Sequence, residues 1–254
     1  MALTVRNGLL SLALLVLVLL VAGYAGLLFL LVSREGWAAS VGSGTLFDLV
    51  LQTLIAPVGA VPAYWLARRA YRKSGSPEAF FFALFAATLG GEALLLVQAW
   101  LQTGGQSAYF TALLTRAVWA FRFMGLFFLF CASLFTFDFA FRKYGNLVVI
   151  SVVAGILVAS WLPLQSSGEH VLLALSDAAS ILLVTTVLGL VVLLNFVLGA
   201  VRAPSSERTA HAAAVACFLG AWALICVWTP WGIVLGIAGA FLAFWKAEQT
   251  MLIV

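Results

Sequence analysis

Ionisable side chains inside apolar stretches are the residues of this sequence best placed to do chemistry. Glu92, Arg122 and Asp177 each lie within an apolar run, several residues from its nearer end. Placing such a group near the centre of a membrane helix costs about 2.5–3.5 kcal/mol, so each one needs a partner or a function. Two carboxylates and a guanidinium could neutralise one another, hold an ion or bind a polar ligand.

Glu92 and Arg122 are expected to meet. Their two apolar runs are consecutive and cross the membrane in opposite directions, and consecutive elements are usually neighbours. Two interpretations stay open: a salt bridge that fixes the register of two helices, or one part of a ligand site in the outer half of the bundle. Because two carboxylates outnumber the one buried arginine, such a site invites a cation, a proton or a second arginine. The predicted polar cluster comprises Glu92, Arg122, Asp177, Arg116, Gln52, Gln98, Ser176 and Ser180.

Two prolines mark a second feature of the same kind. Pro57 and Pro62 lie near the middle of one apolar run. Each proline removes a backbone donor and clashes with the carbonyl four residues earlier, so a helix break is predicted here. A broken helix inside a membrane is tolerated where it lines a cavity, as in transporters, or where it packs against protein. The sequence leaves both interpretations open.

Other polar residues indicate packing rather than chemistry. Asn195 is expected to bond a neighbouring helix. Small residues spaced by four, Ala86 with Gly90 and Ala87 with Gly91, favour close helix packing within the chain. The three cysteines, Cys131, Cys217 and Cys226, all lie in apolar runs and are expected to be buried apolar side chains.

No catalytic or cofactor-binding motif is present. The sequence lacks H-E-x-x-H, G-x-S-x-G, a phosphate-binding glycine loop and any histidine deep in an apolar run. An enzyme is therefore the less favoured class, and no cofactor or metal is expected. The basic run 68–73 is expected to set topology and to touch anionic lipid rather than to bind nucleic acid.

Composition gives these residues their setting. Hydrophobic residues make up 65% of the 254 residues and charged residues 9%, against roughly 45–50% and 25% in a soluble domain. A span needs roughly 20 apolar residues. The prediction is an all-α bundle forming one integral membrane domain, 1–254, with no soluble domain and eight spans at about 8–32, 46–67, 79–102, 116–140, 147–164, 171–201, 209–228 and 230–247. If the last two form one kinked helix, the count is seven.

Positive charge orients the predicted spans. Eight spans place both termini and most of the basic residues on one side, which the positive-inside rule assigns to the cytoplasm. The residues on that side are Arg6, Arg68, Arg69, Arg72, Lys73, Arg142, Lys143, Arg202, Arg208 and Lys246. A bacterial inner membrane is the assumed location.

The expected function is that of a non-catalytic inner-membrane protein. It would be a ligand-sensing membrane domain or a subunit of a larger membrane complex, with a polar site in the outer half. Its partners would be membrane lipids, a membrane protein or a second copy, and a small molecule or ion. The alternative is a transporter of a small solute, ion or proton that uses the proline-broken span.

Overall fold

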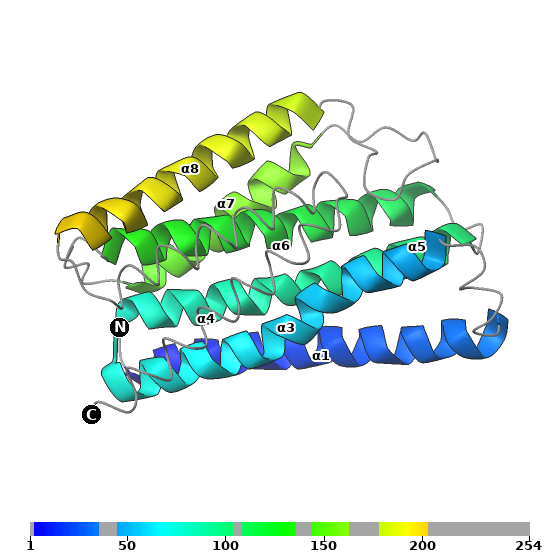
Figure 1. The fold of residues 1–254 in the computed structure, drawn as a ribbon, viewed down its shortest axis with the longest axis horizontal. Helices are drawn as coiled ribbons and strands as arrows, with labels where there is room; N and C mark the ends of the chain where they lie inside the picture. The colour runs from blue at the N-terminus through cyan, green and yellow to red at the C-terminus, as the bar shows by residue number, and fades with distance from the viewer. Residues whose placement is uncertain (1–2, 36–44, 104–107, 136–143, 163–177, 203–254) are drawn as a thin grey trace.

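Long apolar helices lie side by side in the computed structural model (Figure 1), which describes residues 3–35, 45–103, 108–135, 144–162 and 178–202. Every element in these ranges is helical, as the all-α prediction requires. The elements are α1 (Leu3–Glu35), α3 (Thr45–Ser74), α4 (Pro77–Leu89), η1 (Gly90–Glu92), α5 (Ala93–Thr103), α6 (Ala108–Phe135), α7 (Tyr144–Ser160) and α8 (Ala178–Arg202).

Four of the described helices are long and apolar enough to cross a membrane. These segments are Thr4–Leu30, Pro77–Gln98, Tyr109–Phe135 and Leu183–Arg202, and the apolar segment of α7, Tyr144–Ser160, is shorter. The first six predicted spans each fall on a described helix or helix pair. The spans predicted at 209–228 and 230–247 lie outside the described residues, so the count of eight or seven stays a prediction.

The helices form a centre and two edges. In Figure 1, α4, α5 and α6 run through the middle, with α1 along one edge and α8 along the other. Most of the central segments is buried inside the molecule, whereas most of α1 and α8 is not. Large apolar side chains such as Leu19 on α1 and Leu190 on α8 are exposed. Exposed apolar surface on this scale is expected of helices that face lipid rather than water.

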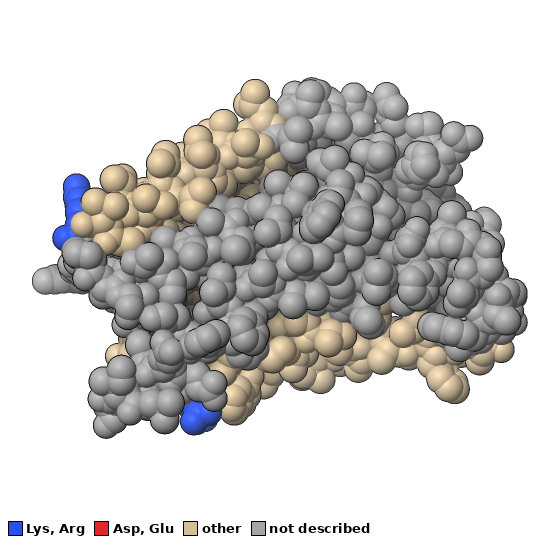
Figure 2. All heavy atoms as spheres, viewed as in Figure 1, with Lys and Arg blue, Asp and Glu red and all other residues tan. Residues whose placement is uncertain are grey.

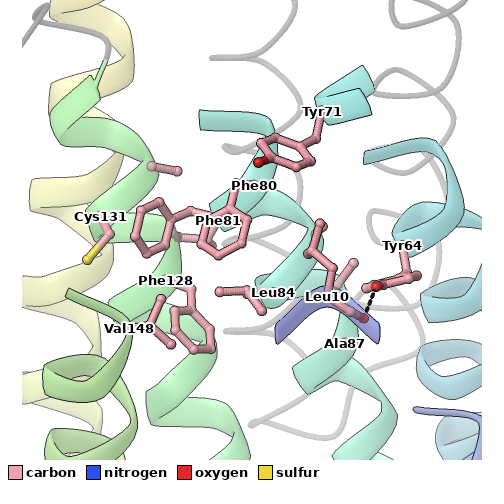
Figure 3. Packing of buried hydrophobic residues seen from close by; sticks show 14 of the residues in the cluster. Leu10, Tyr64, Tyr71, Phe80, Phe81, Leu84, Ala87, Phe128, Cys131 and Val148 are labelled. Carbon is pink, nitrogen blue, oxygen red and sulfur yellow. Dashed lines mark hydrogen bonds between the residues drawn. The ribbon is translucent and has the colours of Figure 1, made fainter. Parts of the chain in front are cut away.

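The main core lies where α4 packs against α3 and α6. Figure 3 shows its aromatic centre, in which Phe80 and Phe81 of α4 meet edge to face with ring centroids 5.3 Å apart. Phe81 in turn lies near Phe128 of α6. Tyr64 of α3 crosses to α1 and donates its hydroxyl to the carbonyl of Leu10. The aromatic contacts join α4 to α6, and the tyrosine hydrogen bond joins α3 to α1.

The turn between α3 and α4 contains a glycine, Gly75, whose backbone conformation favours that residue type. Gly75 has φ of 65°, a region that side chains rarely adopt and that commonly ends helices. Its backbone N–H donates to the carbonyl of Tyr71 at 2.7 Å. Pro77 then opens α4, at a position where a missing N–H costs nothing.

Two predictions about individual helices differ from the described backbone. α3 continues without a break through Pro57 and Pro62, so the predicted helix break is not found in the described backbone. Prolines inside membrane helices are tolerated where other groups satisfy the freed backbone. α6 begins at Ala108 rather than at residue 116. The prediction used Arg116 as a boundary, but this side chain is exposed on the helix surface and does not end the helix.

Candidate functional site

The predicted ion pair is present at the centre of the bundle. Arg122 Nε donates to Glu92 Oε1 at 2.7 Å, and Arg122 Nη2 donates to Glu92 Oε2 at 2.8 Å. The arginine side chain is 3% exposed and the glutamate side chain 12%. A side-on pair of this kind combines charge with two parallel hydrogen bonds, which is the strongest arrangement for these two groups. The expectation that Glu92 and Arg122 meet is confirmed.

The pair lies in the middle part of the described helix α6. Arg122 is the fifteenth of the 28 residues of Ala108–Phe135. A charge near the centre of a membrane-spanning helix is at its most costly in hydrocarbon. The two residues therefore depend on each other, because removing one would leave the other buried without its oppositely charged partner.

Glu92 stands in a local irregularity of its helix. Gly90, Gly91 and Glu92 form the 3₁₀ turn η1 between α4 and α5. Two successive glycines weaken the α-helix here, and a 3₁₀ turn inside a longer helix often marks a hinge or a point of strain. The tighter turn changes the direction in which Glu92 leaves the backbone.

The same two glycines permit close approaches to two different helices, and the approach at Gly91 is the one beside the ion pair. A Cβ on Gly91 would overlap the ring of Phe121, the residue before Arg122 in α6. A Cβ on Gly90 would come within 2.6 Å of Leu17 in α1. Across the same α4–α6 contact, a Cβ on Gly125 would come within 2.6 Å of Thr88. The expectation that these small residues serve packing within the chain is confirmed for Gly90 and Gly91.

A neutral hydrogen bond lies further along the same contact between α5 and α6. Gln98 Nε2 donates to Thr115 Oγ1 at 2.9 Å, and Thr115 Oγ1 donates to the Thr111 carbonyl at 2.9 Å. Gln98 is 1% exposed. A step of six residues from Glu92 to Gln98 is matched by a step of seven back along α6, from Arg122 to Thr115. The two contacts therefore fix one antiparallel register.

An aromatic residue that sequence reasoning missed completes the site. The guanidinium carbon of Arg122 lies 4.9 Å from the ring centroid of Trp119, within cation–π range. The Trp119 side chain is buried, and its indole Nε1 has no hydrogen-bond partner. Its signal was available, because Trp119 stands three residues before Arg122 and residues so spaced share a helix face.

The remaining predicted site residues do not join this group within the described structure. Arg116 is exposed on α6, on a different face from Arg122. Gln52 falls in α3 and Ser180 in α8, but their side chains, like Asp177 and Ser176, lie outside the described part of the chain. The cluster that the structure brings together is thus Glu92, Arg122 and Trp119, with Gln98 and Thr115 further along the same contact. We call these five residues the polar seam.

Two expectations about other polar residues also hold. Asn195 Nδ2 of α8 donates to Ser133 Oγ of α6 at 3.0 Å, so Asn195 bonds a neighbouring helix as predicted. Cys131 is buried, with its sulfur 3.5 Å from Ser151 Oγ of α7. Within the described residues no group of three or more His, Cys, Asp or Glu could hold a metal ion.

The described residues form a helix bundle with apolar membrane-length helices and a buried ion pair between Glu92 and Arg122. Comparison with protein-family models, curated proteins and solved structures found no match to this chain.

Proposed function

We propose that the chain is a non-catalytic, polytopic inner-membrane protein that binds a small polar ligand at the seam. It would act as a ligand-sensing membrane domain or as a subunit of a larger membrane complex. The observation that carries the proposal is the coexistence of a closed ion pair with a buried indole N–H that has no partner. The first argues against catalysis, and the second argues for a binding partner.

The geometry of the pair disfavours acid–base or nucleophilic work. Arg122 engages both oxygens of Glu92. For Glu92 to accept a proton or to attack a substrate, two charge-assisted hydrogen bonds would have to break in a buried setting. A general base is normally free to reach the proton that it removes. The pair is better suited to holding α5 and α6 in one register.

The indole of Trp119 supplies the argument for a ligand. A buried tryptophan usually finds an acceptor for its N–H, and a buried donor without one costs about 1–3 kcal/mol. An oxygen acceptor on a bound molecule would recover that energy. The positive charge of Arg122 beside this ring favours a neutral or anionic oxygen compound.

A transporter remains the second candidate, for a different reason from the one the sequence suggested. The continuity of α3 removes the proline break as its support. The 3₁₀ turn at Glu92 takes its place, since it is an irregular segment in a membrane-length helix that carries an ionisable group. Opening of the ion pair at such a turn would couple the entry of a solute or ion to helix movement.

We propose the topology that positive charge predicts, with eight spans and both termini in the cytoplasm. The turn at Gly75 would then face the cytoplasm, next to the basic end of α3. A reporter inserted at Gly75 should be active only as a cytoplasmic fusion, and so should one placed after Lys246. An outward signal after Lys246 alone would favour seven spans, whereas an outward signal at Gly75 would reverse the whole orientation.

The binding proposal is tested with four purified variants: Glu92→Gln, Arg122→Gln, the double variant and Trp119→Phe. Thermal shifts are measured against a panel of amino acids, carboxylates, sugars, nucleosides and monovalent cations, with Arg116→Gln as the matched control for lost charge. Binding at the seam requires a compound that stabilises the wild type and Arg116→Gln but not Trp119→Phe. If no compound shifts the wild type and only the single charge variants fail to accumulate, the seam is purely structural. If a compound that stabilises the wild type is also taken up into proteoliposomes, the transporter function is favoured.

A further inference from the structure

A second group of buried polar atoms lies at the end of the bundle where α3 ends and α1 and α7 begin. Arg6 of α1 lies between two tyrosine rings, with its guanidinium carbon 5.8 Å from the ring centroid of Tyr71 and 5.8 Å from that of Tyr144. Both distances are within cation–π range. The rings hold the guanidinium in place, but a ring face offers no conventional acceptor for its N–H groups.

Two polar atoms of this group have no hydrogen-bond partner. They are Arg6 Nε and the Tyr71 hydroxyl oxygen, and both atoms are buried. Tyr71 is only 2% exposed, and Figure 3 shows its side chain reaching from α3 across to α4, beside Phe80. A guanidinium N–H can only donate and a phenol can donate, so an acceptor within reach of both atoms would satisfy both. Leaving them without it costs about 1–3 kcal/mol for each.

The charge around the group favours an anionic acceptor. Arg68, Arg69 and Arg72 lie on the last turns of α3, and Arg202 ends α8 at the same end of the bundle. In the face shown by Figure 2, the blue atoms of Lys and Arg lie towards this end. Among the described residues at this end, one side chain is acidic: Glu78 in the first turn of α4.

We propose that Arg6 and Tyr71 bind the phosphate of an anionic phospholipid from the cytoplasmic leaflet. A phosphodiester has several acceptor oxygens, so it can satisfy a guanidinium edge and a phenol together. Arg6 is partly exposed, which gives a headgroup access from the membrane surface. Basic pockets between membrane helices on the cytoplasmic side are a known form of lipid headgroup site. The proposal rests on the membrane orientation proposed above, but it does not depend on the seam.

The test uses Tyr71→Phe, which removes the hydroxyl and keeps the ring. Full-length protein in a non-ionic detergent is titrated with phosphatidylglycerol or with phosphatidylcholine, and the melting temperature is followed. Wild type should be stabilised by phosphatidylglycerol and not by phosphatidylcholine. Tyr71→Phe should melt no lower than wild type without lipid, and its phosphatidylglycerol shift should fall by about half or more, because one of two donors is lost. Arg6→Gln should lose the shift more completely.

Arg69→Gln is the matched control for charge. Arg69 is exposed at the same end of the molecule, and its guanidinium carbon lies 5.4 Å from the Trp65 ring centroid. It should keep the phosphatidylglycerol shift. An equal loss in Arg69→Gln, or a full shift in Tyr71→Phe, would show diffuse attraction to negative charge and overturn the proposal. If inorganic phosphate reproduces the shift at equal concentration, the ligand is a soluble anion and not a lipid, which would also overturn the proposal. Failure of Tyr71→Phe to accumulate would also overturn it, because the hydroxyl would then have an essential partner in the protein.

Discussion

Gly91 and Phe121 pack so tightly that no side chain fits between them. A Cβ built on Gly91 would overlap the Cβ and ring atoms of Phe121. This contact joins η1 to α6 one residue from each member of the ion pair, since Glu92 follows Gly91 and Arg122 follows Phe121. The short reach from one backbone to the other is what allows a side-on pair with both bonds below 3 Å.

Gly91→Ala should therefore destabilise the protein. The added methyl must displace the ring of Phe121, and overpacking of this kind costs about 1–3 kcal/mol. The change is measured by unfolding in a detergent titration. Gly59→Ala in α3 is the matched control, because a Cβ there meets nothing within 4 Å, and it should be neutral or slightly stabilising. Equal stability of the two variants would mean that the Gly91 contact does not constrain the helices.

Arg122→Lys should lose much of the stability that the ion pair provides, although it keeps the charge. Lysine cannot make two parallel bonds to Glu92, and it stacks less well on Trp119. We expect a loss of about 1–3 kcal/mol, as for a charged hydrogen bond that is broken in a buried place. Arg116→Lys on the exposed face of α6 should change stability by less than about 0.5 kcal/mol. A Lys variant as stable as wild type would show that the pair acts only as two point charges.

Two tyrosine-to-phenylalanine variants should change the stability of the protein in different directions. Tyr64 donates to the Leu10 carbonyl across the α1–α3 contact, so Tyr64→Phe should cost about 0.5–1.5 kcal/mol. Tyr71→Phe removes a buried hydroxyl that has no partner, and without anionic lipid it should be neutral or stabilising. The comparison is made in the same detergent by thermal unfolding. A larger loss in Tyr71→Phe than in Tyr64→Phe would reverse the expected order.

The bond from Asn195 to Ser133 should couple α8 to α6 by a modest amount. Hydrogen bonds between membrane helices average about 0.6 kcal/mol, with a maximum near 1.7. A double-mutant cycle of Asn195→Ala and Ser133→Ala measures that coupling directly. Asn146→Ala, at an exposed position of α7, is the control and should leave stability unchanged. A coupling of zero would mean that the two side chains do not interact in the membrane.

The ion pair could be predicted from sequence because its physics is simple. Glu92 and Arg122 stand out in apolar surroundings, and consecutive antiparallel helices bring them to similar depths. Trp119 was missed although it stands three residues before Arg122, because a tryptophan in a membrane helix is most often an interfacial residue. Its role depends on which face of α6 turns inward, and packing decides that face.

The helix boundaries show the same division. Apolar composition placed four of the predicted spans on described helices that are long and apolar enough to cross a membrane, because hydrocarbon thickness sets the length that each must have. It did not locate the start of α6, since Arg116 can extend from an exposed face without ending the helix. It also predicted a break at Pro57 and Pro62 that the continuous backbone of α3 does not have.

The sequence by itself determined an all-helical chain of membrane composition and the meeting of Glu92 with Arg122, because burial costs in hydrocarbon are large and depend on residue type. Only the tertiary structure decided the atoms that bond, the 3₁₀ turn that carries Glu92, and the polar groups left without acceptors at Trp119, Arg6 and Tyr71. Those features depend on distances between helices, and such distances are set by the packing of many side chains at once.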